Sequence, residues 1–69
     1  MASTAADIKQ HLELLHQERV LALDTALARD ASYMADLEEE ILATMHAYVG
    51  SAVTEIASLR ARVSGPLHG

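Results

Sequence analysis

The chain contains no cysteine, phenylalanine or tryptophan, and only one proline and three glycines among its 69 residues. Because cysteine is absent, a disulfide framework and a cysteine-ligated zinc site are both excluded. Basic residues are also few: five lysines and arginines stand against ten acidic residues, a net charge of −5. A chain this acidic, with two tyrosines as its only aromatic residues, argues against nucleic acid as a partner.

Signals for export and membrane insertion are missing as well. The first residues lack the basic and apolar regions of a secretory signal. The longest weakly charged segment, residues 41–59, contains His46, Ser51 and Glu55, which make it a poor transmembrane span. A helix of residues 41–63 on a membrane surface is a further hypothesis, but its polar side has no lysine. We therefore expect a cytoplasmic protein with no membrane partner.

What the chain does have is a high content of apolar residues, 51%. A chain of this length buries only about 60% of its unfolded surface, so a single core is marginal. Proteins this small without disulfides usually depend on a metal, on oligomerisation or on near-ideal helix packing. The composition is also too apolar for a disordered segment.

Strong helix formers supply more than half of the residues, which predicts an all-α fold. Thr4 followed by Asp7 is typical of a helix N-cap, and Ser64, Gly65 and Pro66 are typical of a helix end. We expect one helical domain over residues 1–69, with a first helix over about 5–29, a second helix over about 32–64 and a frayed tail over 65–69.

Apolar residues recur at spacings of three, four and four, an 11-residue repeat, and only Arg19 and Asp30 interrupt it. One interpretation is a two-helix antiparallel hairpin that turns near residues 29–32, where Asp30 and Ser32 are good N-cap residues. The alternative is one long helix in an 11-residue-repeat coiled coil. The hairpin would pair residue i of the first helix with residue 61−i or 62−i of the second. The first helix would then cover the second to about residue 56, and Leu59 and Val63 would extend beyond it without a partner in the same chain.

Both predicted helices carry apolar residues on more than one side. The main apolar face of the first helix consists of Ile8, Leu12, Leu15, Val20, Leu23 and Leu27. Leu14 and Leu21 point nearly the opposite way, and a two-helix monomer would leave such second faces in water. We therefore expect the hairpin to associate into a homo-oligomeric helical bundle, a dimer or a tetramer. The predicted oligomer interface comprises Leu14, Leu21, Met45, Tyr48, Ala52, Ile56, Leu59 and Val63.

Glu13 and His16 form a Glu-x-x-His motif, the spacing that resembles ferritin-like di-iron bundles. With His46 they are the candidate metal ligands. The predicted pairing places His16 level with Met45 and His46, and the acidic residues 38–40 opposite residues 21–24. A metal-binding bundle is therefore the alternative function.

No arrangement of serine and histidine suggests a nucleophile, and glycine-rich phosphate loops are absent, so we expect neither enzymatic activity nor a cofactor. The acidic residues 36–40 fit the start of a second helix, and they are also a candidate docking patch for a basic partner. Arg19 is expected to reach solvent or to pair with a carboxylate of a neighbouring subunit. The leading hypothesis is a self-associating helical scaffold, adaptor or small regulatory subunit that acts through contacts with proteins.

Overall fold

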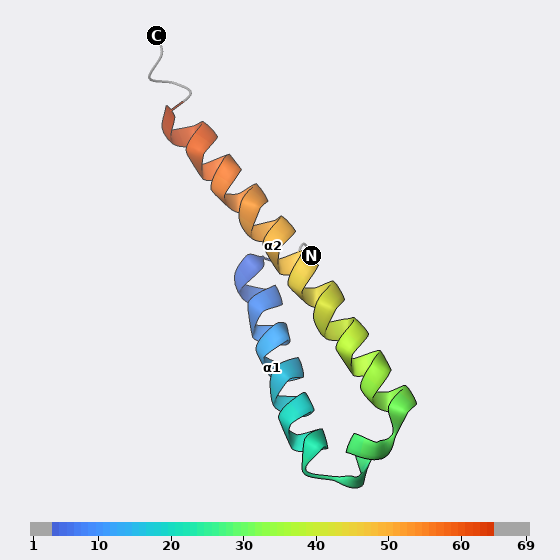
Figure 1. Ribbon diagram of the computed structural model, residues 1–69. Helices are drawn as coiled ribbons and strands as arrows, with labels where there is room; N and C mark the ends of the chain where they lie inside the picture. The colour runs from blue at the N-terminus through green and yellow to red at the C-terminus, as the bar shows by residue number, and fades with distance from the viewer. Residues whose placement is uncertain (1–3, 65–69) are drawn as a thin grey trace.

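The computed structural model describes residues 4–64, which form two α-helices that lie side by side in opposite directions (Figure 1). Helix α1 spans Ala5–Leu23, helix α2 spans Ala31–Ser64, and a short 3-10 helix, η1, spans Ala26–Arg29 between them. The predicted all-helical hairpin is confirmed, and the alternative of one continuous helix is wrong. The predicted helix end at Gly65 and Pro66 and the predicted tail lie outside the described residues.

The start of α1 is set by the predicted N-cap. The backbone N–H of Asp7 donates to Thr4 Oγ1 at 3.1 Å, and the backbone N–H of Thr4 donates to Asp7 Oδ2 at 3.3 Å. These reciprocal bonds satisfy two of the amide groups that the first turn of a helix leaves without partners.

The end of α1 differs from the prediction, because the helix stops at Leu23 instead of continuing to about residue 29. The Thr25 hydroxyl donates to the carbonyl of Ala22 at 2.9 Å and accepts from the N–H of Leu27 at 3.1 Å. Such local bonds compete with the helical ladder. The sequence signal that marks this end is Asp24–Thr25, two residues that favour caps over helix interiors.

Helix α2 begins within one residue of its predicted start. Asp30 Oδ1 accepts from the backbone N–H of Tyr33 at 3.0 Å, as expected of an N-cap residue. With 34 residues, α2 is about 51 Å long and far exceeds α1 with its 19 residues.

The early end of α1 changes the register of the hairpin. The side chain of Arg19 contacts that of Glu38, and His11 Nε2 lies 3.5 Å from Glu40 Oε1. The acidic residues 38–40 therefore lie opposite residues 11–19. The prediction that these acidic residues face residues 21–24 is wrong by more than one helical turn. The reason is that residues 24–29 form η1 and its flanking turn instead of extending the first helix as predicted.

The core is small and lies near the middle of α1. Leu15, Leu37 and Ile41 are about 5% exposed and pack together, with Leu12 and Tyr33 against them. Ala22 is also buried. Part of the predicted main face of the first helix is wrong: Val20, Leu23 and Leu27 are exposed. Val20 and Leu23 each come one residue after Arg19 and Ala22, which continue the line of Leu15, so they are turned about 100° away from that line, and Leu27 lies in η1.

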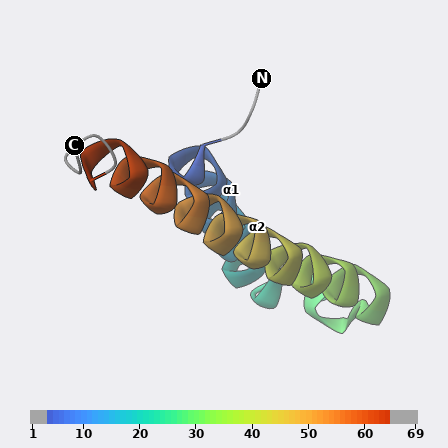
Figure 2. The same ribbon diagram turned by 90° about the horizontal axis from the view of Figure 1, so that it is seen from above.

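Helix α2 continues well beyond the start of α1 (Figures 1 and 2). We call residues 53–64 the overhang; every side chain from Val53 to Val63 is exposed. The predicted overhang of Leu59 and Val63 is confirmed, and it is longer than predicted because the register is shifted. No helix within residues 4–64 has both the length and the apolar character needed to cross a membrane.

Candidate interaction surface

The molecule exposes far more surface than a compact protein of its size. Its radius of gyration is 17.5 Å and its extents are 63 × 19 × 15 Å, whereas a compact chain of this length has a radius of about 11 Å. The accessible surface is 5464 Å², about 1,250 Å² above the value expected for a compact monomer of 7.4 kDa. Twelve large apolar side chains within residues 4–64 are exposed.

Most of the exposed apolar side chains of α2 form one line along the helix. We call this line the apolar stripe, and it consists of Leu42, Met45, Val49, Val53, Ile56 and Val63. The members are 43–61% exposed. Their spacings of three and four residues, with Arg60 in the remaining position, keep them on one side of an α-helix. The stripe runs along both the part of α2 that packs on α1 and the overhang.

The residues predicted for an oligomer interface are mostly at the surface. Leu14, Leu21, Met45, Ile56, Leu59 and Val63 are exposed, and Tyr48 and Ala52 are half-buried. Their role in an interface stays a prediction. Leu42, Val49 and Val53 were missing from the predicted set, although their spacing from Met45 and Ile56 could have identified them.

An ion pair lies beside the stripe. The Arg19 Nε–H donates to Glu38 Oε1, and both side chains are about half exposed. Glu38 is four residues before Leu42, so it continues the line of the stripe towards the start of α2. The predicted pairing of Arg19 with another subunit is not needed, because α2 of the same chain supplies a carboxylate.

The opposite side of the hairpin carries polar contacts between the two helices. The Tyr33 hydroxyl donates to Glu18 Oε2, and Ala5 N–H donates to Glu55 Oε2 at 2.6 Å. The hydrogen bond to the Glu18 carboxylate raises the pKa of Tyr33, and partial burial and the charge of Glu18 add to the effect. The Tyr33 phenol therefore keeps its proton. On this side of the hairpin, hydrogen bonds within one chain hold α1 against α2.

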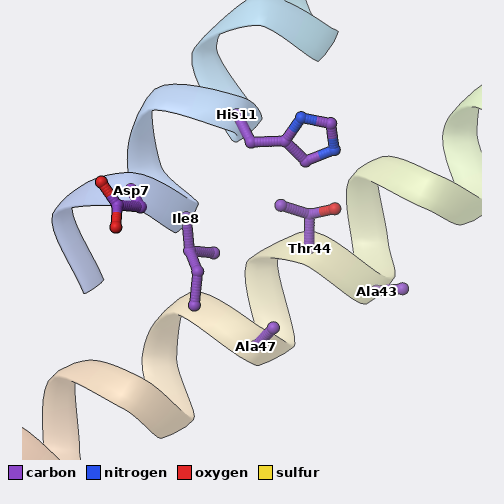
Figure 3. A pocket seen from close by; sticks show the side chains of 6 residues that line it. All are labelled: Asp7, Ile8, His11, Ala43, Thr44 and Ala47. Atoms are coloured by element: carbon purple, nitrogen blue, oxygen red, sulfur yellow. The ribbon is translucent and has the colours of Figure 1, made fainter. Parts of the chain in front are cut away.

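A shallow hollow of about 320 Å³ lies on this side, where the first turns of α1 cross α2 (Figure 3). Its lining residues are Asp7, Ile8, His11, Ala43, Thr44 and Ala47. Figure 3 shows the His11 ring above Thr44, while Ala43 and Ala47 are too small to fill the space. Beside the hollow, His11 Nε2 lies 3.5 Å from Glu40 Oε1, and Asp7 Oδ2 accepts from the backbone N–H of Thr4.

The candidate metal ligands do not come together. Glu13, His16 and His46 are all exposed, and His16 lies between His11 and Arg19, which face residues 40 and 38. The expectation that His16 is level with His46 is therefore wrong. In residues 4–64 no group of three or more His, Cys, Asp or Glu side chains could hold a metal ion.

Comparisons of this chain with protein-family models, with curated proteins and with solved structures found no match.

Proposed function

We propose that this chain is a non-enzymatic, cytoplasmic helical protein that associates with itself and serves as a scaffold, adaptor or small regulatory subunit. The observation that supports the proposal is the apolar stripe, which continues from the hairpin into the overhang and remains exposed along its whole length. Large contiguous apolar surfaces of this kind are typical of interaction sites.

A specific protein–protein interface buries about 800 Å² on each partner. The elongated chain exposes about 1,250 Å² more than a compact chain of its mass, so its shape leaves surface of this order open to a partner. The polar contacts lie on the other side of the hairpin, so association through the stripe would leave them intact.

The test is the subunit number of the untagged protein at micromolar concentration, measured by native mass spectrometry and sedimentation. We expect a dimer or tetramer. Ile56→Asp should weaken association by about a hundredfold or more, because burying an unpaired carboxylate costs several kcal/mol.

The matched control is Ala57→Asp, the same new charge one residue later, on a different side of the overhang and also exposed. This variant should keep the wild-type subunit number. A wild-type protein that stays monomeric and folded would contradict the proposal, as would equal effects of the two substitutions.

A further inference from the structure

We infer, on the basis of the proposed self-association, that two copies of this chain pair through their α2 helices in an antiparallel arrangement with Val49 on the two-fold axis. The side of α2 that pairs is the apolar stripe with Glu38 and Arg60 in the same line. The partner that covers this side of α2 is a second copy of the chain, because the apolar and charged residues of this line are complementary to those of an identical line that runs in the opposite direction.

The positions along this line are symmetric about Val49. Reading outwards, Met45 and Val53 are four residues away, Leu42 and Ile56 are seven away, and Glu38 and Arg60 are eleven away. In an antiparallel pair centred on Val49, two residues lie opposite each other when their numbers sum to 98. Apolar residues then face apolar residues at every step, and an acidic residue faces a basic one at each end. Self-complementarity of this kind is what a two-fold interface requires.

Charge favours the antiparallel direction. In a parallel pair in register, Glu38 would face Glu38 and Arg60 would face Arg60, which places like charges together at both ends. The antiparallel pair replaces these repulsions with two Glu38–Arg60 attractions, and such charge patterns specify partner orientation. Glu38 can accept a second donor, because the Arg19 Nε–H donates to Oε1 and a carboxylate has further acceptor sites on both of its oxygens.

The same register accounts for the overhang. Residues 53–63 of one copy would lie along residues 45–35 of the other, the part of α2 that α1 covers on a different side. Leu42, Met45 and Val49 in this part are at least 43% exposed, so α1 does not block them. The 11-residue repeat favours nearly straight helices, which can remain in contact over this length.

Cysteine crosslinking tests the register, because the native chain has no cysteine. Val49→Cys should form a disulfide-linked dimer under mild oxidation, since the two copies of residue 49 face each other. Met45→Cys alone should not, because its two copies are eight residues apart along the axis, about 12 Å, and a disulfide needs Cβ atoms about 4 Å apart.

An equal mixture of Met45→Cys and Val53→Cys should give linked dimers that contain one copy of each variant, which mass spectrometry identifies. Val53→Cys alone should remain unlinked. Ser58→Cys, in the overhang but away from the stripe, is the control for random collision.

The outcomes separate this inference from the proposed function. An oligomer in which Met45→Cys links to itself, or in which Val49→Cys does not link, overturns the antiparallel register while self-association stands. A wild-type protein that is monomeric at all concentrations overturns both. The expected pattern of links at 49–49 and 45–53, without 45–45 or 53–53, supports the register.

Discussion

The two parts of α2 carry the same kind of sequence but have different surroundings. In the part that packs on α1, Leu37 and Ile41 are buried and Tyr48 and Ala52 are half-buried. In the overhang, Ile56 and Leu59 continue the apolar pattern and are exposed. On the side of α2 that faces α1, the length of α1 therefore decides which apolar residues the chain can bury by itself.

Leu37→Ala should have the largest effect on this comparison. Removing a buried leucine side chain costs roughly 2–5 kcal/mol, a large share of the stability of so small a domain. Ile56→Ala in the overhang should instead change the free energy of unfolding of a single chain by less than about 0.5 kcal/mol and weaken association, because Ile56 is exposed and belongs to the apolar stripe. Denaturation at several protein concentrations separates the effects: Leu37→Ala lowers stability at all of them, and Ile56→Ala reduces the concentration dependence. Similar curves for the two variants would contradict the comparison.

Asp30→Ala should have the next largest effect. The substitution removes the acceptor for the Tyr33 N–H at the start of α2, and loss of an N-cap costs about 1 kcal/mol. Chemical denaturation measures the loss. The control is Asp36→Ala, at an exposed position inside α2, and an equal loss in this control would show that Asp30 does not act as a cap.

Gly50→Ala should stabilise the protein, because Gly50 lies inside α2 just before the overhang. A Cβ at this position meets no atom within 4 Å. Replacing an interior helical glycine by alanine contributes roughly 0.5–1 kcal/mol. Thermal unfolding should show a higher midpoint with an unchanged subunit number. A lower midpoint would indicate that the glycine is needed for close contact with another helix.

Tyr33→Phe should have the smallest effect, and the effect should depend on pH. The pKa of Tyr33 is raised in the folded chain. Its hydrogen bond to Glu18 therefore contributes fully below the unfolded pKa of about 10 and is lost as the pH rises through the folded pKa. The stability of the wild type should fall above pH 10 more than that of the variant. Parallel pH profiles would show that this hydrogen bond does not contribute.

Signals from residues close in sequence predicted much of the fold. The register of the hairpin depended on one such signal that was missed, the helix end at Asp24–Thr25. Thr4 and Asp7 act as their pattern predicts, and Asp30 caps α2, because capping involves residues close in sequence. The helix end at Asp24–Thr25 was missed because the apolar repeat crosses the turn without a break. The contact of Arg19 with Glu38 follows from that register, so it could not be predicted. Leu42 and Val53 were missed because the predicted interface followed the 11-residue repeat, which in α2 passes through Met45, Tyr48 and Ala52 and leaves these two residues out.

Because of the overhang, amide hydrogen exchange can measure what fraction of the chains is paired with a second copy. A helical segment of about twelve residues is marginal in water without tertiary contacts, and residues 53–64 have few such contacts within the chain. Their amide hydrogens should therefore exchange quickly in a single copy and slowly once a second helix covers them. Local unfolding of residues 53–64, which permits this exchange, also exposes the backbone to proteases. Copies without a partner would therefore be degraded first from this end of α2.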